Sequence, residues 1–288
     1  MERFNVLQDL FFTLLTFLKY AGYAILWEYL LERDLELPNE LKSKMRHQLG
    51  RDWFDGQMRD IVVEDMVERV NFLLEVYQYV NLLGVENPFF QEGYSFIHQN
   101  REQLLSACAV FSQPPMETPN QKTLLLAEQF LYFFVEKTSF LMHYELASVG
   151  NSIFSKYRIE GGNYAYTIKY FDVQKGVCKE RKDPQVSNLQ IYDVYSIVLK
   201  NKRESVDYQS VINLSPFFID NNIGGNISAT NQIDLYFLRR YTLSRGKLLY
   251  RNMEKKTQKI ELQKDKTNVL NLKHIRIGDH FDDLLTLI

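Results

Sequence analysis

The 288-residue chain is 45% hydrophobic and 24% charged, a balance that is ordinary for a folded protein and excludes an intrinsically disordered one. Its length allows one large domain or two modest ones, and its formal net charge is only −2. The two cysteines, Cys108 and Cys178, lie far apart and outside any CxxC spacing, which excludes a disulfide framework. We therefore expect a reducing, cytoplasmic setting.

The first predicted helix runs from about Asn5 to Arg33 and contains an apolar run, Leu10–Trp27, that is about the length of a membrane span. Polar residues recur along it at helical spacing and form an expected polar edge: Asp9, Thr13, Thr16 and Lys19. A lysine in the middle of a span costs about 2.5–3.5 kcal/mol on insertion scales. The pattern therefore favours an amphipathic buried helix, with a membrane-associated helix as the alternative.

Three further helical segments are predicted before residue 112. Pro38 begins a short helix over residues 40–49, and the apolar spacing of Ile61–Leu83 predicts a longer one that Gly84 ends. The segment PFFQEG is expected to be a loop, after which Tyr94–Phe111 forms another helix. The three prolines of QPPMETPNQ then mark a clear loop.

The segment Gln121–Ser148 reads as one long helix with apolar residues around most of its circumference. Only a narrow polar seam interrupts them, formed by Gln129, Tyr132, Glu136, Ser139 and His143. Such a helix is expected in the middle of a bundle.

After Val149 the apolar residues alternate with a period of two, which is typical of strands. The predicted strands are Asn163–Phe171, Ile191–Leu199, Val211–Ile219 with an interruption at Pro216, and a hairpin of Ile233–Arg239 with Lys247–Arg251. A short helix is expected over Asp279–Ile288. Because no helix separates the strands, they predict an antiparallel sheet or small barrel.

The sequence therefore predicts an α+β protein, with an acidic helical bundle over residues 1–148 and a basic antiparallel β domain over residues 149–288. Residues 1–100 carry nine Lys and Arg against sixteen Asp and Glu, whereas residues 239–276 carry twelve against three. The basic hairpin is a candidate surface for nucleic acid or for an acidic partner, through Arg239, Arg240, Arg245, Lys247 and Arg251.

The residue types that carry catalysis or bind metals show no recognised spacing. The five histidines form neither HxH nor HExxH, so no metal site and no cofactor are expected. His280 lies close to Asp279, Asp282 and Asp283, a group that fits the acidic first turn of a helix better than a metal site.

Several stretches together resemble a poorly characterised accessory region of bacterial proteins. They are FFTLLTFLKYAGYAILWEYL, LLLAEQFLYFFVEKTSFLMHYELASV, INLSPFFID, IDLYFLRR and LLYRN. In that group a helical segment precedes a small β domain, and the region is often attached to signalling or defence modules such as kinase-like domains. The resemblance implies an accessory chain without an attached catalytic domain.

Some members of that group look HEPN-like, with an RNxxxH-type motif whose arginine and histidine converge on the phosphate and 2′-hydroxyl of RNA. The corresponding stretch here offers Asn100 and Arg101 but no histidine downstream, and His98 lies upstream instead. This departure favours an inactive bundle over a ribonuclease, since a site without its general acid-base group loses a factor of about 100 to 10,000.

We accordingly expect a non-enzymatic interaction or regulatory subunit in bacterial signalling or antiviral defence. Its helical bundle would contact a protein partner or a second copy of itself, without a membrane. The alternative is an RNA- or DNA-binding module, including a degenerate HEPN-type ribonuclease that uses Arg101 and His98.

Overall fold

The computed structural model describes residues 2–49, 63–112, 120–155, 163–172, 177–187, 196–202, 211–220, 235–242, 247–252, 257–261 and 284. The chain divides into two compact units, one of helices over Met1–Met142 and one of strands over His143–Leu287. The predicted α+β class, with helices followed by antiparallel strands, is confirmed.

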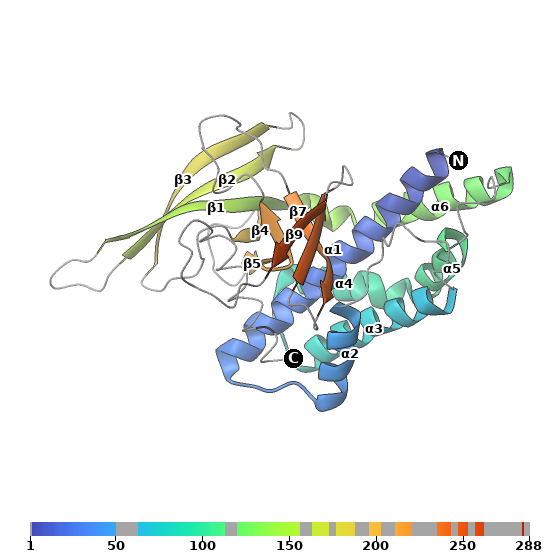
Figure 1. Cartoon of the computed structure of the whole chain (residues 1–288), viewed down its shortest axis with the longest axis horizontal. Helices are drawn as coiled ribbons and strands as arrows, with labels where there is room; N and C mark the ends of the chain where they lie inside the picture. The colour runs from blue at the N-terminus through green and yellow to red at the C-terminus, as the bar shows by residue number, and fades with distance from the viewer. Residues whose placement is uncertain are drawn as a thin grey trace. The chain divides into compact units, whose positions relative to one another are not determined.

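The helical unit contains six α-helices among the described residues (Figure 1). They are α1 Glu2–Arg33, α2 Asn39–Leu49, α3 Val63–Leu82, α4 Pro88–Gln99, α5 Arg101–Phe111 and α6 Gln121–Lys137, followed by the short 3-10 helix η2 Ser139–His143. The helices predicted near residues 5–33, 40–49 and 61–83 are thus confirmed.

The first helix, α1, is enclosed on all sides along its middle. Every residue from Leu18 to Leu26 is buried, which is more than two full turns. The expected polar edge is therefore wrong in its C-terminal half, because Thr16 and Lys19 are both buried. The Nζ atom of Lys19 lies 4.3 Å from the centre of the Tyr20 ring, a cation–π contact that compensates part of the cost of burying a charge.

Of the described helices, α1 is long and apolar enough to cross a membrane. However, 72% of its most apolar 18-residue window is buried inside the protein. Core helices of folded proteins pass the same test of length and composition, so burial of this kind favours a core role for α1.

The ring of Tyr77 on α3 fits between two glycines of neighbouring helices. A Cβ atom at Gly22 of α1 would lie 2.7 Å from the ring atom Cε2, and one at Gly93 of α4 would lie 3.2 Å from Cε1. The hydroxyl donates a hydrogen bond to the carbonyl oxygen of Leu18 at 2.9 Å, and the ring stacks on Phe90 at 5.3 Å. Tyr77 therefore joins α1, α3 and α4 in one contact.

A cluster of phenylalanines joins the remaining helices to α1. Phe11 stacks on Phe111 of α5 with 4.6 Å between ring centres, and it lies 5.5 Å from Phe134 of α6. Phe134 in turn meets Phe96 of α4 edge-on at 6.2 Å. Such rings bury large apolar areas, so this cluster supplies much of the core at this end of the unit.

The long helix predicted over Gln121–Ser148 is wrong in its extent and its position. Helix α6 ends at Lys137, where the Thr138 hydroxyl donates to the carbonyl oxygen of Phe134 at 2.7 Å, and Tyr144 already begins a strand. The pairing of that strand with β4 outweighs the helical pattern of its residues. In addition, α6 buries only Ala127 and Phe134, so α1 and not α6 occupies the middle of the bundle.

The predicted loop PFFQEG and the single helix after it are also corrected. Asn87 accepts a hydrogen bond from the backbone N–H of Phe90 at 3.1 Å, and Pro88 occupies the first turn, so α4 begins here. Asn100 separates α4 from α5, and its side-chain amide donates to the carbonyl oxygen of Phe96 at 2.7 Å. The Asn87 cap and Pro88 therefore begin a helix where the sequence predicted a loop.

The second unit contains two antiparallel sheets that do not close among the described strands, so the sheet alternative holds rather than the barrel. The first has the order β3-β2-β1-β4-β5 and the second β6-β7-β8-β9. Their strands are β1 Tyr144–Ser155, β2 Asn163–Asp172, β3 Val177–Ser187, β4 Ile197–Asn201, β5 Val211–Asn213, β6 Phe218–Asp220, β7 Leu235–Thr242, β8 Lys247–Asn252 and β9 Thr257–Glu261.

The predicted interruption at Pro216 and the predicted hairpin are confirmed. Chain segments on either side of Pro216 form β5 and β6 in different sheets, and β7 pairs with β8. Ser215 links the sheets, because its hydroxyl accepts from the N–H of Ile197 at 3.0 Å and donates to the carbonyl oxygen of Phe218 at 3.2 Å. Residues 191–195 of one predicted strand and all but Leu284 of the predicted C-terminal helix lie outside the described residues.

We predict that Gly22→Ala destabilises the protein by about 1–3 kcal/mol, because the new methyl group would overlap the pinned and buried Tyr77 ring. In an unhindered helix the same change stabilises by about 0.5–1 kcal/mol. The sign of the change in stability therefore shows whether a methyl group at position 22 meets the Tyr77 ring. Urea unfolding followed by circular dichroism measures it. An unchanged or increased midpoint would contradict the close approach.

Candidate functional site

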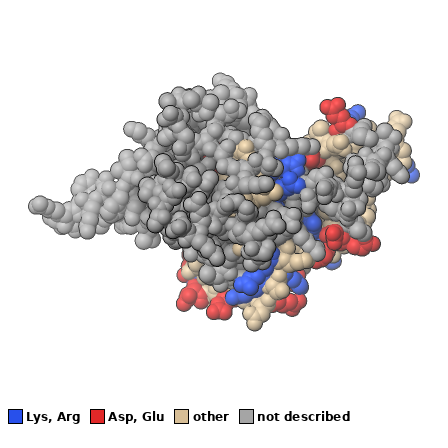
Figure 2. All heavy atoms as spheres, in the orientation of Figure 1, with Lys and Arg blue, Asp and Glu red and all other residues tan. Residues whose placement is uncertain are grey.

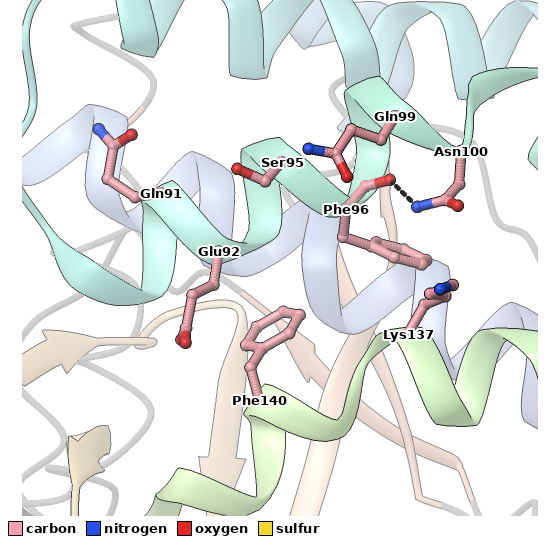
Figure 3. A pocket seen from close by; sticks show the side chains of 8 residues that line it. All are labelled: Gln91, Glu92, Ser95, Phe96, Gln99, Asn100, Lys137 and Phe140. Carbon is pink, nitrogen blue, oxygen red and sulfur yellow. Dashed lines mark hydrogen bonds between the residues drawn. The ribbon is translucent and has the colours of Figure 1, made fainter.

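The helical unit carries a hollow of about 350 Å³ beside α4, lined by polar residues and two phenylalanines and called here the α4–α6 hollow (Figure 3). Five residues of α4 and the residue that follows it line one side, and the end of α6 and η2 line the other. The described lining residues are Gln91, Glu92, Ser95, Phe96, Gln99, Asn100, Lys137 and Phe140.

Helix periodicity and two aromatic contacts position these side chains. Gln91, Ser95 and Gln99 follow one another at intervals of four residues along one face of α4. Phe140 of η2 meets Phe89 of α4 edge-on, with 5.9 Å between ring centres. Lys137 ends α6, and its Nζ atom lies 5.7 Å from the centre of the Phe133 ring.

The hollow offers one carboxylate, one ammonium group and several amides to a polar group. Glu92 and Lys137 lie on different helices, so a ligand between them would meet both signs of charge. Among the described lining residues none is histidine or cysteine, and Ser95 has the only hydroxyl. Covalent catalysis needs a nucleophile with an adjacent base, and these residues do not supply that pair.

The predicted nuclease residues lie near the junction of α4 and α5 but have separate contacts. His98 is exposed in the last turn of α4, and its ring packs against Tyr94 with 5.5 Å between centres. Arg101 is exposed at the start of α5 and donates to Oδ1 of Asn71 on α3 at 3.2 Å. Neither side chain lines the hollow among its described residues.

The predicted basic hairpin residues fall partly outside the described residues. Strands β7 and β8 pair Arg240 with Leu249 and Thr242 with Lys247. Strand alternation then places positions 240, 247 and 251 on one face of the sheet. Arg251 is buried with 8% exposure, Arg239 is partly exposed beside the bulge, and Arg245 lies outside the described residues.

Charges on the described helical surface are mixed in sign. Figure 2 shows acidic and basic side chains interspersed over the described part of one face. Lys44 illustrates the pattern, since its ammonium group binds Glu75 at 2.8 Å and Glu40 at 2.9 Å. The hydrogen bond to Glu75 raises the pKa of Lys44 most, and the hydrogen bond to Glu40 raises it further. In return, the hydrogen bond from Lys44 lowers the pKa of Glu40.

The largest feature that sequence reasoning missed is the solvent-exposed side of α6, called here the α6 face. Leu125, Leu126 and Tyr132 are 54%, 38% and 74% exposed. The face comprises Lys122, Leu125, Leu126, Gln129, Tyr132, Phe133 and Glu136. Large apolar side chains exposed together along one helix are typical of interaction sites in folded proteins.

Candidate metal ligands do not cluster among the described residues, and the Cys108 thiol is buried. In that part of the chain no group of three or more His, Cys, Asp or Glu side chains could hold a metal ion. Cys108 is buried on α5, and burial raises the pKa of its thiol to about 12. A thiol in such surroundings is inert rather than nucleophilic.

Comparison of the chain with models of protein families, with curated proteins and with solved structures finds no match. The resemblance to bacterial accessory regions therefore stays a prediction.

We predict that Cys108 resists alkylation in the folded protein. In a Cys178→Ser variant, iodoacetamide at pH 8 should leave the native protein unlabelled, because a pKa of about 12 leaves almost no thiolate at that pH and the side chain is enclosed. The same reagent should label it fully in denaturant, as mass spectrometry will show. Stoichiometric labelling of the native protein would restore Cys108 as a candidate reactive group.

Proposed function

We propose that this chain is a non-catalytic interaction subunit that binds a protein partner through the α6 face. The observation that carries the proposal is the exposure of Leu125, Leu126 and Tyr132 along one helix of a well-packed unit. Amphipathic helices commonly recognise partners through apolar side chains at three- and four-residue spacing. Burying these side chains against a partner would contribute about 25 cal/mol per Å² of apolar area.

The α6 face is held ready for binding by contacts on the other side of the helix. Phe134 and Ala127 are fully buried, and Glu128 binds Arg3 of α1 at 2.6 Å. Figure 1 shows α6 beside the N-terminal half of α1. Asn120 caps the first turn by accepting from the N–H of Thr123 at 2.8 Å. Binding of a partner would therefore cost little conformational entropy, because this helix is already ordered.

The setting of this interaction in bacterial signalling or antiviral defence rests on the resemblance alone. The same is true of an accessory role beside a separate enzyme. Both stay predictions, as does the cytoplasmic location.

Nucleic-acid binding is the second candidate function. The register of β7 and β8 favours it, because positions 240, 247 and 251 share one face of the sheet. Against it, Arg251 is buried and so has little surface to offer to a phosphate. A salt-dependent titration with labelled single-stranded RNA separates the two functions, since phosphate contacts weaken steeply as salt rises.

We predict that a photoreactive benzoylphenylalanine in place of Tyr132 will give a discrete cross-linked adduct in cells of the source organism. The reason is that Tyr132 is 74% exposed on the α6 face. Gel mobility and mass spectrometry of the purified adduct will read its mass and composition. The adduct should disappear when Leu125→Ser is added.

The matched control is the same photoreactive residue in place of Leu82, which is 82% exposed at the end of α3 and lies off the α6 face. It should give no discrete adduct. Equal products from both positions, or none from Tyr132, would contradict the proposal.

A further inference from the structure

We infer that the partner of the α6 face is a second copy of this chain, with two α6 helices packed antiparallel around a two-fold axis at Gln129. The inference rests on the proposed function and names its partner. The spacing, exposure and charge of the seven residues of the face support this pairing.

The central residues of the face repeat with alternating steps of three and four. They are Lys122, Leu125, Gln129, Tyr132 and Glu136, with Leu126 and Phe133 beside them. This is the spacing by which helices pack along a common seam. The seam spans about 21 Å at 1.5 Å per residue, nearly the whole length of α6.

The face is complementary to itself in the antiparallel orientation. With Gln129 at the axis, Leu125 lies level with the partner's Phe133, and Leu126 lies level with the partner's Tyr132. Lys122 then lies level with the partner's Glu136. Symmetry repeats each of these pairs, so every apolar residue meets an apolar one and each charge meets its opposite.

A parallel pairing of the same helices is disfavoured by charge. It would set Lys122 against the partner's Lys122 and Glu136 against the partner's Glu136. Like charges at such positions repel, whereas the antiparallel arrangement removes both conflicts. The charges therefore select one orientation.

The two end charges are available for this role. Lys122 and Glu136 are exposed, and neither forms an ion pair within the described part of the chain. Glu128, in contrast, lies off the face and already binds Arg3. Lys122 and Glu136, which lie on the α6 face, are thus left for a partner. Glu128, which lies off the face, forms its ion pair within the helical unit.

The test is charge exchange between two variants, measured by sedimentation equilibrium of the full chain at low salt. Lys122→Glu and Glu136→Lys should each weaken self-association at least about tenfold, because each places like charges opposite one another twice. The double variant should recover the affinity of the original protein. An equimolar mixture of the two single variants should associate with each other, since their charges are then opposite.

The control is Leu82→Ser, which changes an exposed apolar residue off the face and should leave self-association unchanged. Recovery by the double variant and by the mixture is a result that unspecific aggregation cannot give. Equal association of all variants would overturn the antiparallel pairing.

The cross-link through position 132 distinguishes self-pairing from binding to a different protein. An adduct of twice 34.1 kDa, composed of this chain alone, supports self-pairing. A chain that stays monomeric but cross-links to a different protein overturns self-pairing and leaves the interaction function standing. A monomeric chain without an adduct overturns both.

Discussion

The helical unit depends on the fit of one aromatic ring between two glycines. Gly22 and Gly93 leave room on α1 and α4 for the ring of Tyr77, whose hydroxyl is fixed by the carbonyl oxygen of Leu18. Because a side chain at either glycine would meet the ring, the separation of three helices is set at this point. The burial of α1 from Leu18 to Leu26 follows from how closely its neighbours approach.

With α1 enclosed, α6 needs only one side for attachment. The Phe11, Phe111 and Phe134 cluster fixes that side, and the Arg3–Glu128 pair lies at its edge. The other side of α6 keeps apolar residues that the unit itself does not use. A helix with two apolar sides and only one partner is the structural basis for an interaction role.

The sequence predicted the helices and strands better than it predicted which helix is central. The spacing of apolar residues and the positions of glycine and proline identified α1, α3, the break at Pro216 and the β7–β8 hairpin, because these signals are local. The apolar residues around most of the circumference of α6 were interpreted as a sign that the helix lies in the middle of the bundle. A helical wheel cannot distinguish an apolar residue that faces a core from one that faces a partner, since both require the same chemistry.

The site was harder to predict for a similar reason. The α4–α6 hollow depends on Asn87 and Pro88 beginning a helix where a loop was expected, so its lining could not be assembled from the sequence. The regular steps between Gln129, Tyr132 and Glu136 were visible but were interpreted as part of a polar seam. Exposure of the leucines beside them, which only tertiary structure gives, changes their meaning.

The polar residues of the α6 face matter as much as its apolar ones. A continuous apolar strip could slide along its partner or pair in either direction, because hydrophobic burial has no direction. Gln129 in the middle and opposite charges at the two ends leave a single register in which no charge meets its like. The apolar side chains supply the affinity of such a contact, and the charges restrict it to one geometry.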